Sequence, residues 1–369
     1  MNQDDQDRCE QLQDHKDEDD GFWDIALRLD PCEGGFHDHR NEQEESSDDD
    51  DDKDALGGIK PTKYRLPVAT KPSIVVLELS PLAKEDGVWA PVGADAWYAS
   101  ALLTSMILMG IPTSENSTTD GTLPENDDLQ RTGNHKRTIQ HQPMITLDSS
   151  DNQSNSTRVL ELGSGAMGLS GLATAVALSL QPERYPSSWT VTLTDNDPKV
   201  LQQLQANVSA NRCNILNLTA DGDNPNENNN NSNKTINVEY LDWAEKEIED
   251  NEDDMSSLLL TADLVIGSEL AYTHQTGTAL VKVLLRLLDK NPKVHIWIVQ
   301  VRDRYGWCEI VERELESKPG IELHSIIPLP WDIHEMASTL IPMGGTLDRH
   351  AFGAFHIFRS DQQGPPFGL

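Results

Sequence analysis

Hydrophobic runs and amphipathic stretches alternate along the chain from Tyr64 onward. Short apolar or β-branched runs are typical of strands, and apolar residues at three- and four-residue spacing are typical of helices. The pattern predicts strands over residues 158–162, 190–194, 238–241, 264–267, 294–301, 323–327 and 352–358. It predicts helices over residues 94–109, 169–180, 198–211, 277–288 and 307–316.

This alternation predicts the fold class. Strands that alternate with helices form a mostly parallel sheet with helices on both faces. The last two predicted strands are separated only by a long irregular segment, so we expect them to form an antiparallel edge pair. Before the sheet, Pro67 and Pro72 bracket a turn that leads into the apolar run Ile74–Leu79, which favours a β-hairpin. We therefore expect a Rossmann-like, seven-stranded, mostly parallel sheet with an antiparallel last strand and an N-terminal hairpin extension.

Polar segments mark the expected domain boundaries. Residues 1–57 hold five basic and 22 acidic residues, and such dense like charge favours a disordered acidic region. Its one apolar island, residues 22–29, predicts either a short docking helix or a transient helix without a partner. We expect one domain over residues 58–360 with a flexible tail over 361–369. Two low-complexity segments, at residues 112–156 and 221–234, are expected to be inserts inside that domain.

A glycine cluster follows the strand predicted over residues 158–162, and a helical pattern begins at Leu169. Glycine permits sharp turns and close approach of a ligand to the backbone. The helix start adds unpaired N–H groups and the positive end of the helix dipole. Open α/β sheets bind nucleotides at this position, outside the carboxyl end of a strand. The segment from Gly163 to Gly168 therefore predicts a nucleotide or nucleoside site.

Acidic residues at two strand ends narrow the choice of ligand. The spacing Gly163-x-Gly165-x-x-Gly168 by itself matches the dinucleotide fingerprint. Glu161 would repel a pyrophosphate but can meet a cationic amino-acid group, directly or through water. Asp195 can accept from both hydroxyls of a ribose in either type of cofactor. The alternatives are that Glu161 is an ordinary strand-end acid and that Asp195 caps a helix.

Two later strand ends carry further candidates. Asp242 can accept from an adenine amino group while the indole of Trp243 packs on the ring. The strand over residues 264–267 delivers Glu269 and Tyr272 to the carboxyl edge of the sheet, where we expect the reaction centre. The alternative for Asp242 and Trp243 is a surface acid beside a core tryptophan. The alternative for Glu269 and Tyr272 is a loop acid beside a packed tyrosine.

Taken in order, these motifs resemble the seven-β-strand, S-adenosylmethionine-dependent methyltransferases of family 16, which are chiefly protein-lysine methyltransferases. The resemblance covers residues 64–360. It rests on Val88-Trp89, Val159–Gly165, Thr194-Asp195, Leu241–Trp243 and the D/E-x-x-Y motif Glu269–Tyr272.

The resemblance implies S-adenosylmethionine as the cofactor and a lysine side-chain nitrogen of a protein as the methyl acceptor. It implies that Glu269 and Tyr272 border the lysine channel as the catalytic candidates, and no metal is expected. The candidate cofactor-binding residues are Trp89, Glu161, Gly163, Ser164, Gly165, Asp195, Asn196, Asp242, Trp243 and Ser268.

Charge and cysteine content bear on partners and compartment. The net charge of −33 disfavours nucleic acid, because phosphates repel an acidic surface, and it suits a basic protein partner or solubility alone. A translation factor, calmodulin or a chaperone are candidate substrates under the resemblance. We expect a monomer with no membrane partner. Four scattered cysteines and no signal-peptide pattern favour the cytoplasm, with the nucleus also open.

Two alternatives remain open at this point. An NAD(P)-dependent oxidoreductase would use the same glycine fingerprint, although 27 residues separate Gly168 from Asp195 and no Tyr-x-x-x-Lys pair is present. A non-catalytic binding protein could keep the fold and lose the reaction. Its support is Met167, which stands where the family's Gly-x-Gly-x-Gly loop has its third glycine.

Overall fold

The structure, a computed structural model, describes residues 61–68, 74–82, 97–112, 141–142, 144, 156–180, 188–218, 233–243, 257–341 and 349–360. All of them belong to one unit, Gly57–Pro342 with Asp348–Leu369. The second unit, Met1–Leu56 with Met343–Leu347, lies outside the described residues. So do the predicted acidic region, the island over residues 22–29, Trp89, most of both predicted inserts and the tail over 361–369.

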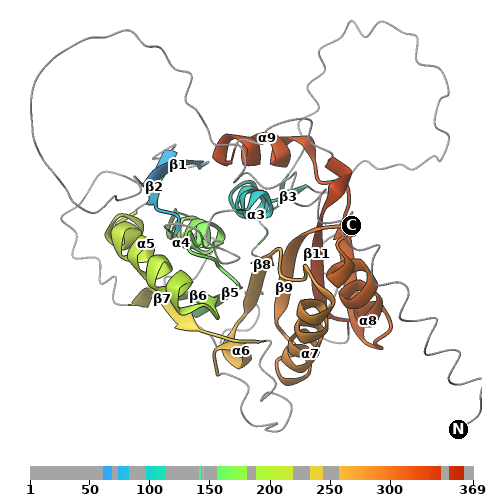
Figure 1. The fold of residues 1–369 in the computed structure, drawn as a ribbon. Coiled ribbons are helices and arrows are strands. Elements are labelled where there is room, and N and C mark those ends of the chain that lie inside the picture. Colours follow the sequence, from blue (N-terminus) through green and yellow to red (C-terminus); the bar gives the residue numbers. More distant parts are fainter. Residues whose placement is uncertain are drawn as a thin grey trace, which may run out of the picture. The chain divides into compact units, whose positions relative to one another are not determined.

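Seven strands form one sheet in the spatial order β10-β11-β9-β8-β5-β6-β7 (Figure 1). All neighbours pair in parallel except β11, which is antiparallel to both β10 and β9. This confirms the expected mostly parallel sheet with an antiparallel last strand. The strands are β5 Ser156–Leu162, β6 Ser188–Asp195, β7 Lys234–Tyr240, β8 Leu264–Ser268, β9 His295–Val301, β10 Ile321–Ile326 and β11 Phe352–Arg359.

The hydrophobic pattern explains the two layers of helices. α3 and α4 pack against each other on one face of the sheet, while α7 packs against η3 and α8 on the other. The second face holds a core of apolar residues from the strands and from α7, centred on Leu284, Trp307 and Phe355, all fully buried. The helices are α3 Tyr98–Met109, α4 Leu169–Leu180, α5 Pro198–Leu216, α6 Ser257–Thr261, α7 His274–Lys290, the π-helical η3 Trp307–Glu312, α8 Arg313–Glu316, α9 Trp331–Leu340 and the short 3-10 turn η4 Arg349–Ala351.

Capping side chains fix the first residues of α5 and α7. The Asp197 carboxylate accepts from the backbone N–H groups of Lys199 and Val200, and Pro198 occupies the first position of α5. This leaves Asp195 free of the capping role. At α7, Thr273 and Thr276 form a reciprocal capping box. Both helix starts are thereby fixed next to the carboxyl edge of the sheet.

The expectation of an irregular segment between the last two strands was wrong. Residues 331–340 form α9, which packs on α3. Its apolar positions Ile333, Met336, Ala337 and Leu340 follow helical spacing and are buried, but polar residues interleave them and obscure the pattern. The expected antiparallel edge pair is confirmed, because β10 forms the edge of the sheet and pairs antiparallel with β11.

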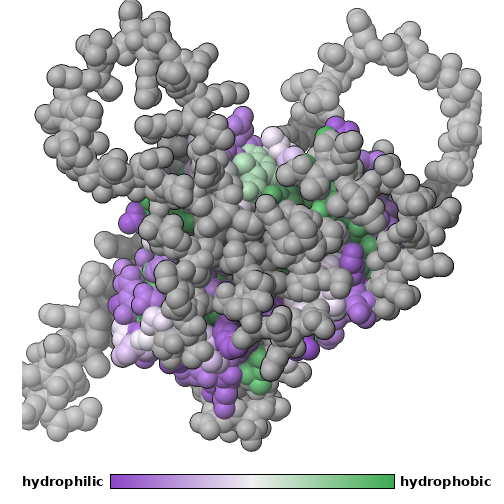
Figure 2. All heavy atoms as spheres, turned by 180° about the vertical axis from the view of Figure 1, so that it is seen from behind, coloured by the Kyte–Doolittle hydropathy of each residue, from purple (hydrophilic) through white to green (hydrophobic). Residues whose placement is uncertain are grey.

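The N-terminal hairpin is confirmed as an antiparallel pair, β1 Thr62–Pro67 with β2 Ile74–Leu79. Leu66, Leu77 and Leu79 point inward and are fully buried. A second antiparallel pair joins β3 Ile111–Pro112 to β4 His141–Gln142, and β4 lies inside the first predicted insert, which was expected to be a loop throughout. In the view of Figure 2, hydrophilic residues gather at the lower left, while hydrophobic and hydrophilic residues both appear at the upper right.

Candidate functional site

The glycine loop between β5 and α4 is fastened to the end of β6. Gly163, Gly165 and Gly168 adopt positive φ angles of 59°, 63° and 58°, a region that only glycine enters without steric cost. Ser164 N–H donates to the Thr194 carbonyl at 2.7 Å, and Ser164 Oγ accepts from Thr194 N–H at 3.0 Å. The loop is therefore set by its own backbone preferences and by one neighbouring strand.

Met167 causes no distortion in this loop. Its side chain is buried, and Gly168 supplies the third left-handed position instead. A Cβ atom at Gly168 would lie 2.5 Å from Leu204 Cδ1 and 2.6 Å from Leu193 Cδ2, so glycine is required here for space as well as for conformation. The loop thus reads Gly-x-Gly-x-x-Gly, with Met167 as an apolar anchor.

Glu161 lies buried beneath the glycine loop. Its Oε2 accepts from Gly171 N–H at 3.1 Å, and a Cβ at Gly171 would come within 2.5 Å of the same oxygen. Burial raises the pKa of the Glu161 carboxyl to about 7, against the opposing effect of hydrogen bonds from Ser164, Gly171 and Ser170. A cation next to this group would favour its ionised form.

Asp195 closes the loop from the end of β6. Its Oδ2 accepts from Gly165 N–H at 3.1 Å, and its Oδ1 accepts from the N–H groups of Asn196 and Asp197. Burial raises the pKa of the Asp195 carboxyl, while these three N–H groups oppose the rise. Within the described part of the chain, neither Asp195 nor Glu161 forms an ion pair. The two acids leave negative charge at the loop, which suits a cationic ligand.

The remaining predicted cofactor residues lie at the same edge or outside the described residues. Leu241 N–H donates to the Asp195 carbonyl at 3.0 Å, which brings the following Asp242 to the end of β6. Trp243 packs partly buried against the core beneath α7. Ser268 is the last residue of β8. Trp89 lies outside the described residues.

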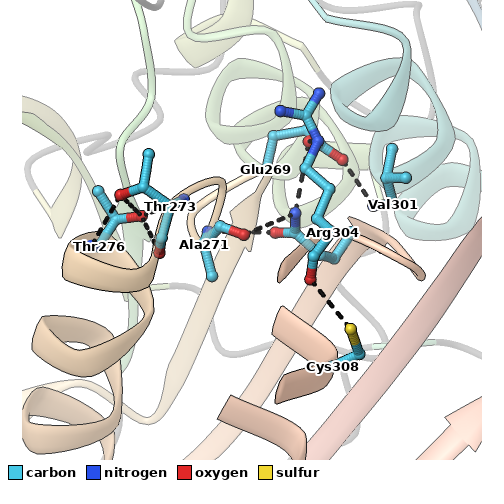
Figure 3. Close-up of polar contacts among 8 residues, drawn as sticks. Glu269, Ala271, Thr273, Thr276, Val301, Arg304 and Cys308 are labelled. Carbon is cyan, nitrogen blue, oxygen red and sulfur yellow. Dashed lines mark hydrogen bonds and ion pairs between the residues drawn. The ribbon is translucent and has the colours of Figure 1, made fainter. Parts of the chain in front are cut away.

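A second turn, Glu269–Tyr272, follows β8 at this edge. Glu269 has φ 52° and is the one non-glycine residue with positive φ among the residues that the structure describes. Its Oε1 accepts from Val301 N–H at 2.7 Å, and its Oε2 forms an ion pair with Arg304 Nε at 3.0 Å (Figure 3). Burial raises the pKa of the Glu269 carboxyl, and the Arg304 charge and the Val301 N–H oppose that rise.

Residues that the sequence reasoning missed hold this turn from β9 and the segment after it. Gln300 binds the backbone of Ala271 on both sides, accepting from its N–H at 3.3 Å and donating to its carbonyl at 3.4 Å. The Arg304 guanidinium lies 5.7 Å from the ring centroid of Trp97. Gln300 lies inside the strand predicted over residues 294–301, and Arg304 lies in the polar run after it. Neither position specifies a partner.

Leu270 joins the two turns. A Cβ atom at Gly163 would lie 2.9 Å from Leu270 Cδ2, and one at Gly267 would lie 2.6 Å from Leu270 Cδ1. The leucine side chain therefore fills the space between the glycine loop and the end of β8. Burial raises the pKa of the Tyr272 phenol, the Asp195 charge adds to this, and Arg304 opposes it. Tyr272 is thus within electrostatic reach of both turns and keeps its proton at neutral pH.

Comparison with known families identifies this arrangement. A model of the lysine methyltransferase family matches residues 82–306, more than half of the chain. The chain belongs to the lysine methyltransferase family. The matched segment contains both turns and every predicted site residue. This membership decides against the oxidoreductase alternative.

Individual relatives of this family member are distant. An uncharacterized protein of Dictyostelium discoideum is 32% identical over 164 residues, and the match covers 43% of this chain and 42% of that protein. An O-methyltransferase from Bacillus cereus in complex with SAH is 11% identical over 56% of this chain and 75% of that chain, with a TM-score of 0.33. The human methyltransferase 10 domain containing protein is 11% identical over 58% of this chain and 76% of that chain, with a TM-score of 0.32.

Membership in the lysine methyltransferase family points to S-adenosylmethionine as the cofactor of this site. The site fits this cofactor. Two buried carboxylates, Glu161 and Asp195, lie beside the glycine loop and form no ion pair with any residue that the structure describes. They can hold the cofactor's ammonium group and its ribose hydroxyls respectively. Among the described residues, no helix is long and apolar enough to cross a membrane.

Proposed function

We propose that the protein transfers a methyl group to the side-chain nitrogen of a lysine in a protein substrate. The observation that carries this proposal is the contact between the two turns, in which Leu270 fixes Glu269–Tyr272 against Gly163 of the cofactor loop. The family name points to the same acceptor. An acceptor that reaches Tyr272 is thereby held at a set distance from the cofactor loop.

The chemistry sets two requirements. When bound, S-adenosylmethionine supplies a methyl group on a positively charged sulfur, which leaves with the electron pair of the broken carbon–sulfur bond. The acceptor nitrogen must lie in line with that bond, so positioning provides much of the rate enhancement. The nitrogen must also be neutral, although a free lysine has a pKa of ~10.4. Burial beside a positive charge lowers that value.

Tyr272 and Glu269 take different parts in this scheme. Tyr272 keeps its phenol proton and offers both a ring face and a hydroxyl to the incoming lysine. Glu269 already accepts from Val301 and pairs with Arg304, so its part is to hold the turn rather than to remove the proton. The proton of the lysine ammonium leaves to water before the transfer.

The acceptor class is tested by methyl transfer with labelled S-adenosylmethionine into a panel of purified proteins. A translation factor, a chaperone and calmodulin are the first candidates, and the net charge of −33 favours a basic segment around the target. Hydrolysis of the labelled protein should yield methyl-lysine. Recovery of the label only as methyl-histidine or as a methyl ester would reject the lysine assignment while leaving the methyltransferase assignment intact.

Variants at Tyr272 separate its two groups. We expect Tyr272→Phe to lower kcat about tenfold and Tyr272→Ala about a hundredfold, because the second also removes the ring. Cofactor affinity should stay within about twofold in both variants, since Tyr272 serves the acceptor. Tyr305→Phe, at an exposed tyrosine just before η3, is the matched control and should behave as wild type.

A further inference from the structure

Two asparagines on α5, Asn207 and Asn211, bind the backbone at the end of β2 and just after it, as a neighbouring strand would. Asn211 Oδ1 accepts from Glu78 N–H at 3.0 Å, and its Nδ2 donates to the Glu78 carbonyl at 2.8 Å. Asn207 makes the same pair of bonds with Ser80, both at 2.8 Å. Both side chains are almost fully buried.

The spacing explains why two asparagines suffice. Four residues of a helix advance about 6 Å, and two residues of a strand advance about 6.6 Å. Asn207 and Asn211 are four apart on α5, and Glu78 and Ser80 are two apart on the hairpin. Each amide therefore meets one residue of the strand edge, and the hairpin is fixed to α5 by four hydrogen bonds.

The second N–H of each amide distinguishes the two asparagines. In Asn211 it donates to the Asn207 carbonyl at 2.8 Å, within α5 itself. In Asn207 it donates to the Ala166 carbonyl at 2.8 Å, which lies in the glycine loop between Gly165 and Gly168. All hydrogen-bonding groups of the Asn207 amide are satisfied. A single buried side chain thus connects the hairpin to the cofactor loop.

We propose that Asn207 is a positioning residue for the cofactor, which holds the glycine loop in its binding conformation and couples it to the N-terminal hairpin. Gly165 N–H donates to Asp195 on one side of Ala166, and on the other side Gly168 immediately precedes α4 and accepts from Leu172 N–H. Loss of the Asn207 bond leaves a buried carbonyl without its donor and lets this part of the loop shift. Asn211 anchors the hairpin equally but does not touch the loop.

The test compares Asn207→Ala with Asn211→Ala in the full chain. Both variants lose hairpin anchoring, so we expect similar decreases in Tm. Only Asn207→Ala should weaken S-adenosylmethionine and S-adenosylhomocysteine binding, by about tenfold in calorimetric Kd, which corresponds to ~1.4 kcal/mol. Its KM for S-adenosylmethionine should rise while kcat at saturation changes less. Asn211→Ala should keep both Kd values within about twofold.

Two further measurements keep the proposal testable if Asn207→Ala is too unstable to purify. Asn207→Asp keeps the side-chain shape and the bond from Ser80 N–H, but turns a carboxylate oxygen toward the Ala166 carbonyl, and should weaken cofactor binding at least as much. Hydrogen exchange of the amides over residues 163–168 should accelerate in the Asn207 variants and not in Asn211→Ala. Equal cofactor affinity in the Asn207 and Asn211 variants would overturn the proposal. These readouts use the cofactor alone, so they do not depend on whether lysine is the acceptor.

Discussion

Two turns meet at the carboxyl edge of the sheet, and each contains left-handed backbone obtained in a different way. The first, Gly163–Gly168, places glycine at all three of its left-handed positions. The second places Glu269 at such a position, at a steric cost of about 1–2 kcal/mol. Its carboxylate is held by donors from β9 and the segment after it. The glycine turn is therefore specified locally, whereas the Glu269–Tyr272 turn depends on its tertiary partners.

The largest expected effect breaks the second turn. Glu269→Ala removes the buried partner of Arg304 and keeps the strained backbone, and we expect a loss of about 3–5 kcal/mol in the free energy of unfolding. kcat should fall more than a hundredfold, because the turn no longer holds Tyr272. Chemical denaturation and steady-state kinetics measure the two effects.

Glu269→Gly isolates the strain in that turn. It removes the same carboxylate but relieves the left-handed backbone, so it should be about 1 kcal/mol more stable than Glu269→Ala. If the alanine variant proved as stable as the glycine variant, the turn would not be strained, and the contrast between the two turns would be lost.

A smaller effect is expected from the first turn. Gly168→Ala introduces a Cβ at φ 58° that overlaps Leu204 and Leu193, with an expected loss of about 2–4 kcal/mol in stability. Cofactor binding should weaken at least tenfold, because the loop cannot keep its shape. Thermal unfolding and calorimetry with S-adenosylhomocysteine report both effects.

Gly320→Ala is the control for that substitution. Gly320 also has a positive φ, 77°, but the nearest atom to an added Cβ is Arg359 Nη2 at 3.7 Å. It should lose only about 1–2 kcal/mol in stability and leave cofactor binding unchanged. Equal effects at both glycines would show that steric overlap in the cofactor loop is unimportant.

A pH dependence sharpens the comparison further. Because the pKa of Glu161 is raised to about 7 from 4.5, a cationic ligand must displace its proton below that pH. We expect affinity for S-adenosylmethionine to increase up to about tenfold per unit as pH rises toward 7, and to level off above it. Calorimetry in two buffers of different ionisation enthalpy should detect proton release at acidic pH.

The Glu161 carboxyl has the opposite effect on the stability of the free protein, which should decrease as pH rises. Its stabilising contribution is fully present below pH 4.5, the unfolded value, and is lost as pH rises to about 7. Glu161→Gln should remove both the proton release and this part of the stability profile. Proton release that persists in this variant would assign the effect to another residue.

The smallest expected effect lies at the end of the second turn. Thr273→Ala removes one half of the capping box that begins α7, with a loss of about 1 kcal/mol in stability. Cofactor Kd should not change, and kcat should fall less than fivefold, because Gln300 still holds Ala271. A large kinetic effect would show that the cap, and not β9, orders the acceptor turn.

The difference between the turns also explains what the sequence could predict. Glycines, strand-end acids such as Asp195 and the helix cap Asp197 act through local conformation, so their positions were readable. The ion pair between Glu269 and Arg304 and the hydrogen bonds of the Asn207 side-chain amide join residues that are far apart in the chain. No periodicity or spacing encodes such contacts.

The fold follows the same rule. Six of the seven strands of the sheet and the helices over residues 169–180 and 277–288 were predicted close to their observed bounds, because apolar runs and helical spacing are strong there. The strand predicted over residues 238–241 begins earlier, at Lys234, because polar residues make up most of its first half. α9 was missed because polar residues separate its apolar positions. η3 was predicted as ordinary helix, since a π-helical turn depends on packing around Trp307.

Leu270 has a consequence for how this enzyme could be altered. Its side chain occupies the gap between Gly163 and Gly267, so its size sets how closely the Glu269–Tyr272 turn approaches the glycine loop. In-line displacement is sensitive to shifts of the order of 1 Å. We expect a shorter or longer aliphatic residue at this position to change the distance between the glycine loop and the Glu269–Tyr272 turn. The side chains of both turns would stay the same.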